Sequence, residues 1–281
     1  MLENFICPNG EITSVKDCFE HCQNRCLTMP TLIMASRTRK WDGKTFSVTQ
    51  LLQPTLISYL KLTVPETMSP MNTLQAALGT SGHALLEGCM PRGYVGEFRM
   101  IDSNGKITGQ PDCIDLKTQT LYDYKFVAAF SLAKMLGKKR EGYFYEIKRG
   151  AKKGQTEWRY RWIDGGKPDY HNYDWQLNMY RILLKQNNID IKHMVIQATA
   201  KESERQLLDL GLDRRSYLID IPFYPDNDVL EKFNLAYDRL YDAVSTNTMP
   251  SPCDDTWNGK RCESYCSVNE HCPYYQKGKK A

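Results

Sequence analysis

The chain has 281 residues, of which 41% are hydrophobic and 25% are charged, and its formal net charge is +4. This composition is typical of a folded globular protein and excludes the disordered and fibrous classes. No apolar run reaches the ~18 residues that a membrane-spanning helix needs, and the acidic start lacks the layout of a signal peptide. We therefore expect an intracellular protein that has no membrane partner.

The pattern of apolar residues and turn residues predicts an α/β fold. Residues 1–30 form a cysteine-rich head, in which Ser14 is the expected N-cap of a short helix that carries Cys18 and Cys22 on one face. Residues 31–248 form the main body, and residues 249–281 form a cysteine-rich tail. Within the body we expect helices over 31–65, 71–88, 172–187 and 226–245, and strands over 97–102, 106–116, 121–127, 191–199 and 216–222.

A basic insertion at about 134–168 is predicted to form a helix and a β-hairpin before the helix over 172–187. Between Lys134 and Arg161 it carries ten lysines and arginines against three glutamates, with tyrosines, tryptophans and a phenylalanine interleaved. Basic groups beside flat rings suit a phosphate backbone with stackable bases, although a solvated hairpin with ordinary strand aromatics gives the same pattern.

The segment from Leu121 to Phe126 carries the strongest chemical signal. Strand alternation places Asp123 and Lys125 on one face, and the preceding strand brings Asp112 beside Asp123. A divalent cation relieves the repulsion of two close carboxylates; oxygen ligands favour Mg²⁺, and a histidine ligand lets Mn²⁺ compete. A lysine beside such a cation suits phosphodiester hydrolysis. A surface ion pair would give the same Asp-x-Lys spacing.

Asp-x-Lys alone is a weak motif, but it occurs here as one of four sequence motifs in a characteristic order. They are Gly79-Thr80-Ser81-Gly82-His83, Gly109-x-x-Asp112, Asp123-x-Lys125 and Gln176-Leu177-Asn178-Met179-Tyr180. Together they resemble the RecB-like branch of the PD-(D/E)XK nucleases, which includes helicase-linked exonucleases, CRISPR adaptation nucleases and many phage proteins. The resemblance implies a restriction-endonuclease-like core, in which a mixed central sheet is flanked by helices.

The resemblance also assigns roles. It implies that His83, Asp112, Asp123 and the backbone carbonyl of Tyr124 bind the metal. Lys125 would be the catalytic lysine, and Gln176 and Tyr180 would contact DNA or brace the site. A histidine packed in the core is the alternative for His83, and Glu97 is a further candidate carboxylate of the site.

The ten cysteines favour metal or cluster ligation over disulfides in an intracellular chain. The tail cysteines suit Zn²⁺ or an iron–sulfur cluster and are Cys253, Cys262, Cys266 and Cys272. The head cysteines could form a zinc site of their own, with His21 as a substitute ligand, and are Cys7, Cys18, Cys22 and Cys26. Packing as small apolar side chains better suits Cys89 and Cys113.

RecB-like relatives often hold a [4Fe–4S] cluster with three C-terminal cysteines and one N-terminal cysteine. This chain departs from that pattern, because no cysteine lies in the segment around Pro54 to Tyr59 and the first gap among the last three tail cysteines is three residues instead of two. The fourth ligand would then be Cys253 or a head cysteine.

We therefore expect a Mg²⁺- or Mn²⁺-dependent deoxyribonuclease, of exonuclease or flap type, that acts on single-stranded or end-bearing DNA. The resemblance implies a bacterial or phage-encoded cytoplasmic protein with DNA as partner, joined by a helicase or by a recombination or CRISPR-adaptation protein. Two alternatives stay open: a DNA-binding or assembly module of the same fold without turnover, and a restriction-type endonuclease.

Overall fold

The computed structural model describes residues 2–37, 41–254 and 256–275. Inside helix α5 the side chains of residues 73, 75, 76 and 78–80 lie outside this description, so part of the run that precedes His83 is not covered. The backbone forms two compact units. The first unit comprises residues 1–84, 99–110 and 224–281, and the second comprises residues 85–98 and 111–223.

Two small sheets and a set of helices build the first unit. Its strands are β1 (Leu2–Ile6), β2 (Ile12–Ser14) and β4 (Glu66–Met68) in one sheet, and β3 (Phe46–Ser47), β7 (Ile107–Gly109) and β6 (Met100–Ile101) in the other. Its helices are α1 (Val15–Glu20), α2 (Met29–Ser36), α3 (Val48–Leu51), α4 (Thr55–Thr63), most of α5 (Pro70–Glu87), α9 (Asp226–Ser245), α10 (Lys260–Ser264) and the 3₁₀ turn η1 (Asn269–His271).

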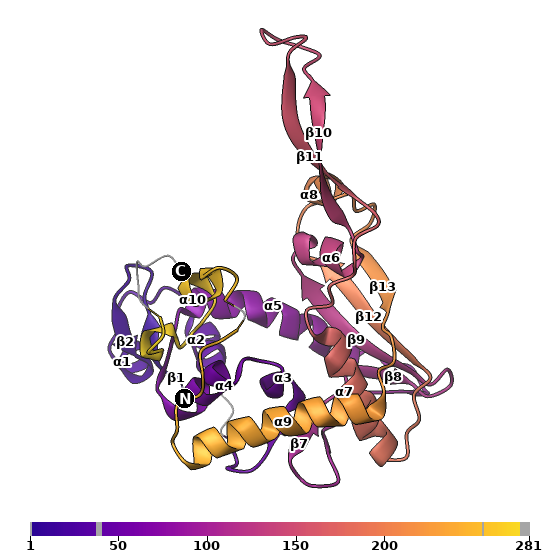
Figure 1. Cartoon of the computed structure of the whole chain (residues 1–281). Helices are drawn as coiled ribbons and strands as arrows, with labels where there is room; N and C mark the ends of the chain where they lie inside the picture. Colours follow the sequence, from indigo (N-terminus) through magenta and orange to yellow (C-terminus); the bar gives the residue numbers. More distant parts are fainter. Residues whose placement is uncertain (1, 38–40, 255, 276–281) are drawn as a thin grey trace. The chain divides into compact units, whose positions relative to one another are not determined.

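The long helix α9 organises the core of the first unit (Figure 1). Its buried side chains recur every three or four residues, as one apolar stripe requires, and are Val229, Phe233, Tyr237, Leu240 and Ala243. This stripe packs against α3 and α4, whose buried residues include Val48, Leu56 and Leu60.

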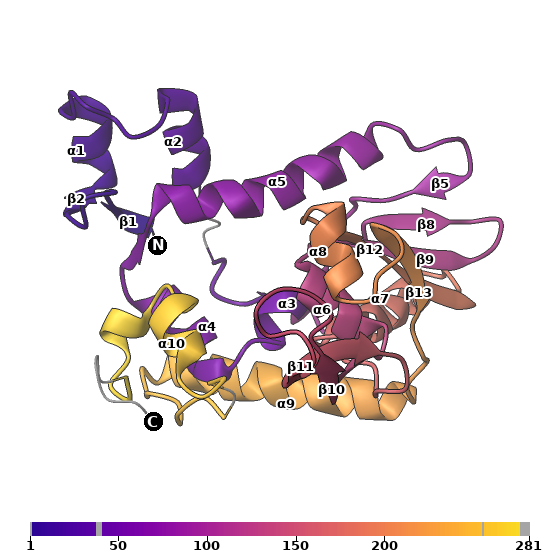
Figure 2. The same ribbon diagram turned by 90° about the horizontal axis from the view of Figure 1, so that it is seen from above.

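The second unit is built on a five-stranded mixed sheet. Its strand order is β13 (Ser216–Asp220), β12 (His193–Ala200), β9 (Thr120–Val127), β8 (Cys113–Asp115) and β5 (Tyr94–Val95). Figure 2 shows β5, β8 and β9 side by side. Among the described strands of this sheet, β9 and β12 run parallel and the other neighbouring pairs are antiparallel. Parallel neighbours need a long crossover, and here it contains α6 (Ala129–Met135), a hairpin and α7 (Tyr173–Gln186); α8 (Glu204–Asp209) lies between β12 and β13.

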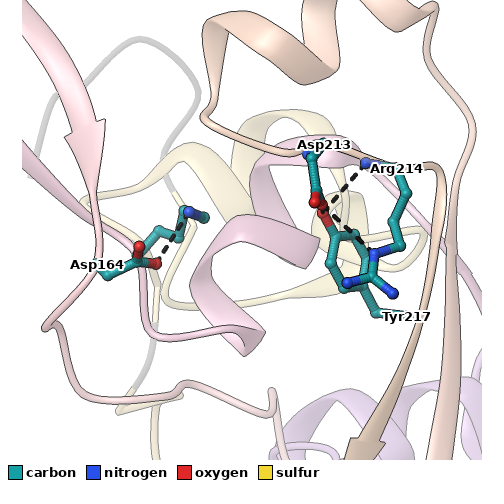
Figure 3. A network of polar contacts seen from close by, with 5 residues as sticks. Asp164, Asp213, Arg214 and Tyr217 are labelled. Atoms are coloured by element: carbon teal, nitrogen blue, oxygen red, sulfur yellow. Dashed lines mark hydrogen bonds and ion pairs between the residues drawn. The ribbon is translucent and has the colours of Figure 1, made fainter.

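The hairpin of the second unit consists of β10 (Lys139–Glu146) and β11 (Thr156–Ile163), and it extends beyond the five-stranded sheet of that unit (Figure 1). Its base is held by an ion pair between Lys138 and Asp164, whose atoms are 2.9 Å apart (Figure 3). On β13, the hydroxyl of Tyr217 accepts from the backbone N–H groups of Asp213 and Arg214 in the preceding loop and donates to the Asp213 carboxylate (Figure 3).

The α/β class and many elements expected from the sequence are confirmed. The strand over 121–127, the helices over 172–187 and 226–245, the hairpin of the basic insertion and the Ser14 cap are all present, and the Ser14 side chain accepts from the N–H of Asp17. Three smaller expectations were wrong. Helix α1 ends at Glu20, so Cys22 lies beyond it; the strand over 97–102 is reduced to Met100–Ile101; and the helix before the hairpin, α6, lies almost entirely before the insertion. Two larger expectations were also wrong. The long helix over 31–65 is broken into α2, β3, α3 and α4, with Pro54 as the N-cap residue of α4.

The second of these larger wrong expectations is a continuous strand over 106–116. That segment is divided into β7 and β8, which belong to different sheets. Pro111 lies between them and lacks the N–H that a ladder requires. In the described part of the chain, no helix has both the length and the apolar character to cross a membrane.

Candidate active site

Asp123 and Lys125 lie on β9, which has a hydrogen-bonded neighbour on each side. Alternation along the strand places both side chains on one face, as the sequence predicts. The Lys125 Nζ lies 2.6 Å from Oδ2 of Asp123, and the Asp123 side chain is only 1% exposed. A charge pair this deep in a protein requires close geometry and further hydrogen bonds to offset desolvation.

The surroundings of Lys125 keep its amine protonated. Burial acts to lower the pKa of Lys125, but the carboxylates of Asp123 and Asp112 act in the opposite direction and leave it above its usual value. The Lys125 Nζ also lies 4.8 Å from the centre of the Tyr173 ring. The lysine is therefore a fixed positive charge among two carboxylates and an aromatic face.

Helix α7 supplies the polar groups that cover Asp123. The Gln176 Nε2 donates to Oδ1 of Asp123 at 3.2 Å and also contacts the Tyr180 hydroxyl at 3.1 Å. Gln176 and Tyr180 are four residues apart and so share one face of the helix. Burial, with help from the charge of Asp123, raises the pKa of Tyr180 to about 12, so its hydroxyl is neutral at physiological pH.

Asp112 stands directly before β8, beside the strand that carries Asp123. The antiparallel register pairs Cys113 with Tyr122, which brings the preceding Asp112 opposite Asp123. The backbone N–H of Tyr124 donates to Oδ2 of Asp112 at 2.7 Å. The expected proximity of Asp112 and β9 is therefore present.

His83, Glu97 and Asp112 form a group that could hold a metal ion. Each offers one ligand atom, and these atoms lie within 4.8 Å of one another. Helix α5, which carries His83, continues into the second unit from Leu85 onward. Glu97 has a φ of +55°, which is uncommon for a residue with a side chain, and its N–H donates to the carbonyl of Pro111 at 2.9 Å.

This donor set fits a hard divalent cation. Two carboxylates and one imidazole suit Mg²⁺ or Mn²⁺, with the imidazole favouring Mn²⁺. Asp123, which was also expected to bind the metal, is not in this group; its carboxylate contacts Lys125 and Gln176 instead. The role expected for the carbonyl of Tyr124 stays a prediction.

Glu97, which the sequence offered as a further site carboxylate, lies in the group with His83 and Asp112. Tyr173, the first residue of α7, was not among the residues expected, and no motif in the sequence indicated it. Asp115, on β8, accepts hydrogen bonds from Thr118 and Tyr94.

The four tail cysteines line one cavity. The other walls come partly from α4, and the lining residues include Leu56, Ile57, Leu60 and Asn269 together with Cys253, Cys262, Cys266 and Cys272. Burial raises the pKa of Cys253 to about 11, and the other three thiols add to this rise against the effect of Arg261. The tail is tied to the body by Ser267, whose hydroxyl donates to Glu66 at 2.6 Å.

The four head cysteines also lie near one another. Burial raises the pKa of both Cys7 and Cys18, and neighbouring thiols raise each of them further. Arg25 draws the loop between Cys22 and Cys26 back to α1 by donating to the carbonyls of Cys18 and Phe19. A zinc ion in the head stays a prediction.

Comparison with known proteins adds no relative. No protein-family model matches the chain, and no curated protein matches it.

Proposed function

We propose that the protein is a divalent-metal-dependent deoxyribonuclease with a restriction-endonuclease-like core of the RecB-like type. The observation that carries this proposal is the buried pair of Asp123 and Lys125 on a central strand, with Asp112 on the neighbouring strand. A surface ion pair, the alternative for this motif, would be exposed, whereas Asp123 is 1% exposed.

The metal ligands proposed here are His83, Glu97 and Asp112. A divalent cation would acidify an attacking water and stabilise the negative charge that develops on phosphorus. The protein's own contribution is to gather these donors in one place. Glu97 supports the proposal further, because unusual backbone conformations of non-glycine residues cluster at functional sites.

Lys125 is placed to orient the attacking water and to offset negative charge on the phosphate. Its ammonium group lies among the carboxylates of Asp123 and Asp112 and against Tyr173. Gln176 positions Asp123 by donating to one of its oxygens, which leaves the other to Lys125. Tyr180 keeps Gln176 in this orientation. Preorganised charges of this kind are the main source of catalysis in phosphoryl transfer.

We further propose that the tail binds an iron–sulfur cluster. All four tail cysteines line one cavity, and four cysteine thiolates are the usual ligands of such a cluster. Cys253 then takes the fourth position, against the helix α4.

A cleavage assay tests the proposed activity. Linear single-stranded DNA, blunt duplex and circular single-stranded DNA, all labelled, would be incubated with Mg²⁺, Mn²⁺ or EDTA. We expect metal-dependent cleavage of the linear single strand, and a loss of at least ~100-fold in Lys125→Ala and Asp123→Ala. Lys201→Ala is the matched control, because Lys201 is exposed directly after β12, the parallel neighbour of β9.

Each outcome decides between the alternatives. Binding without cleavage by the unmutated protein, with both metals, would contradict the nuclease and favour a module without turnover. Cleavage of circular DNA at a defined sequence would favour a restriction-type endonuclease.

A further inference from the structure

The two faces of the β10–β11 hairpin differ in character. The register pairs Phe144 with Trp158 and Tyr143 with Arg159, and paired residues of an antiparallel ribbon lie on the same face. The first face, called here the aromatic face, carries Arg140, Gly142, Phe144, Glu146, Thr156, Trp158, Tyr160 and Trp162. The second, called here the paired face, carries Lys139, Glu141, Tyr143, Tyr145, Glu157, Arg159, Arg161 and Ile163.

The aromatic face presents a row of exposed rings. Phe144, Trp158 and Tyr160 are 73%, 52% and 53% exposed. The centre of the Trp158 ring lies 4.8 Å from that of Phe144 and 6.1 Å from that of Tyr160. Gly142 makes room for Trp158, because a Cβ atom there would lie 2.1 Å from the indole. Large apolar side chains that stay exposed in a cluster mark an interaction surface.

The paired face satisfies its own charges. The guanidinium of Arg159 lies 3.8 Å from the centre of the Tyr145 ring, and that of Arg161 lies 5.2 Å from the Tyr143 ring. Arg159 also pairs with Glu157, and Arg161 with Glu141. On the aromatic face, the guanidinium of Arg140 lies 3.6 Å from the centre of the Tyr160 ring. The exposed rings of Phe144 and Trp158 are therefore the ones we expect to meet a ligand.

The tip of the hairpin is strongly basic. Lys148, Arg149, Lys152 and Lys153 are all exposed, and no acidic residue lies among them. The segment from Lys139 to Ile163 carries eight lysines and arginines against three glutamates, so its net charge of +5 exceeds the +4 of the whole chain. This charge favours a polyanion over an apolar or cationic partner.

The hairpin is attached firmly to its own unit. Trp162, at the base of the aromatic face, packs edge-on against Phe130 of α6 with ring centres 5.3 Å apart. The Lys138–Asp164 ion pair and the hydrogen bond from the Gly166 N–H to the Gly137 carbonyl at 2.7 Å close the base. The exposed rings are therefore presented on an anchored ribbon.

We propose that the aromatic face of this hairpin binds single-stranded DNA. Unpaired bases stack on Trp158 and Phe144, and the basic tip contacts the phosphates. Duplex DNA offers the phosphates but not the base faces, since its bases are stacked inside. The choice of DNA over RNA rests on the proposed nuclease function, whereas the preference for single strands rests on the exposed rings.

Binding measurements in EDTA test this separately from cleavage. The full chain would be titrated into a fluorescein-labelled oligo(dT), and the anisotropy followed. Stacking on an aromatic side chain contributes ~1–3 kcal/mol per base, so Trp158→Ala should weaken binding roughly 5- to 150-fold. Tyr145→Ala, on the paired face of the same ribbon, should change the affinity by less than about 2-fold. Circular dichroism would confirm that both variants fold.

A second variant tests the tip. Replacing Lys148, Arg149, Lys152 and Lys153 with glutamine should lower the slope of log affinity against log salt by roughly 2 to 3, at ~0.7 per lost phosphate contact on a single strand. Trp158→Ala should leave that slope unchanged, because stacking releases no counterions.

The outcomes separate this inference from the proposed function. A protein that binds oligo(dT) through Trp158 but cuts no DNA would overturn the proposed nuclease activity and support the proposal that the aromatic face binds single-stranded DNA. Unchanged oligo(dT) affinity in Trp158→Ala would overturn the proposal that the aromatic face binds single-stranded DNA, whether or not the protein cuts DNA. Equally tight binding of a duplex would overturn the single-strand preference, and equally tight binding of oligo(U) would overturn the assignment to DNA.

Discussion

The backbone N–H of Tyr124 donates to Oδ2 of Asp112 at 2.7 Å. Strand β9, which carries Asp123 and Lys125, thereby holds the carboxylate of Asp112, the residue directly before the neighbouring strand β8. This contact occupies one oxygen of Asp112, and the carboxylate also belongs to the group formed with His83 and Glu97. Asp112 thus joins the proposed metal group to the strand that carries the proposed catalytic lysine.

Two substitutions of Asp112 should separate its charge from its hydrogen bond. Asparagine keeps an oxygen that can accept from Tyr124, but it loses the negative charge. We expect Asp112→Asn to lower cleavage by at least ~100-fold with little change in the melting temperature. Asp112→Ala also leaves the N–H of Tyr124 without this acceptor, which costs ~1–3 kcal/mol for a buried group. It should therefore melt several degrees lower.

Cleavage rates with Mn²⁺ and melting curves would be measured for both variants. Asp220→Asn, an exposed carboxylate of β13 in the same sheet, is the control and should behave like the unmutated protein. Full activity in Asp112→Asn would remove the carboxylate from the proposed metal group.

Gln176 should be sensitive to charge more than to size. Its Nε2 donates to Asp123 at 3.2 Å and also contacts Tyr180. Gln176→Glu removes the donor and places a second negative charge against Asp123, and close like charges disfavour the ionised state. We expect a loss of ~100-fold in kcat/KM, whereas Tyr180→Phe, which keeps the ring and loses one hydroxyl contact, should lose about 10-fold or less. Equal losses in the two variants would argue against a positioning role for Gln176.

The regular parts of the fold were predictable because their patterns are local. Helix α9 repeats its buried residues at helical spacing from Val229 to Ala243, and it has the bounds that the sequence predicts. In β9, the alternation of Asp123 and Lys125 with aromatic neighbours likewise indicates which side chains share a face.

The remaining features depend on tertiary pairing. The sequence around Pro111 does not show that β7 and β8 join different sheets, because each partner strand lies in a distant segment or across a turn. Glu97 enters the site only through a backbone conformation with φ of +55°, and no periodicity predicts that conformation. The expectation for 31–65 failed for a local reason, since Pro54 is a helix breaker within the segment.

Gly96 should tolerate no side chain. A Cβ atom there would lie 2.1 Å from the carbonyl oxygen of Asp112 and 2.7 Å from Cε of Met90. The methionine end can move, but the carbonyl belongs to the backbone that positions Asp112. We therefore expect Gly96→Ala to lower the melting temperature by roughly 4–10 °C, as overpacking of ~1–3 kcal/mol does in a chain of this size. Cleavage should fall at least ~10-fold.

The double variant Gly96→Ala/Met90→Ala identifies which contact matters. Removing the methionine side chain leaves the contact with the Asp112 carbonyl, so activity should stay low. Recovery of activity in the double variant would show that the crowding against Met90 is responsible instead.

The tail cysteines should bind a chromophore and stabilise the protein. Cys262→Ser and Cys266→Ser each remove one thiol from the cavity against α4. For a [4Fe–4S] cluster, we expect anaerobically purified protein to be brown, with absorbance near ~400 nm and bound iron. Both variants should lose the absorbance and the iron. They should also melt at least ~10 °C lower, because a structural metal centre contributes several kcal/mol to folding.

Cys89→Ser is the matched control, since Cys89 is exposed and lies outside the cavity. A colourless protein that carries one zinc ion per tail would contradict the cluster, and a metal-free tail with an unchanged melting temperature in Cys266→Ser would contradict any structural metal there.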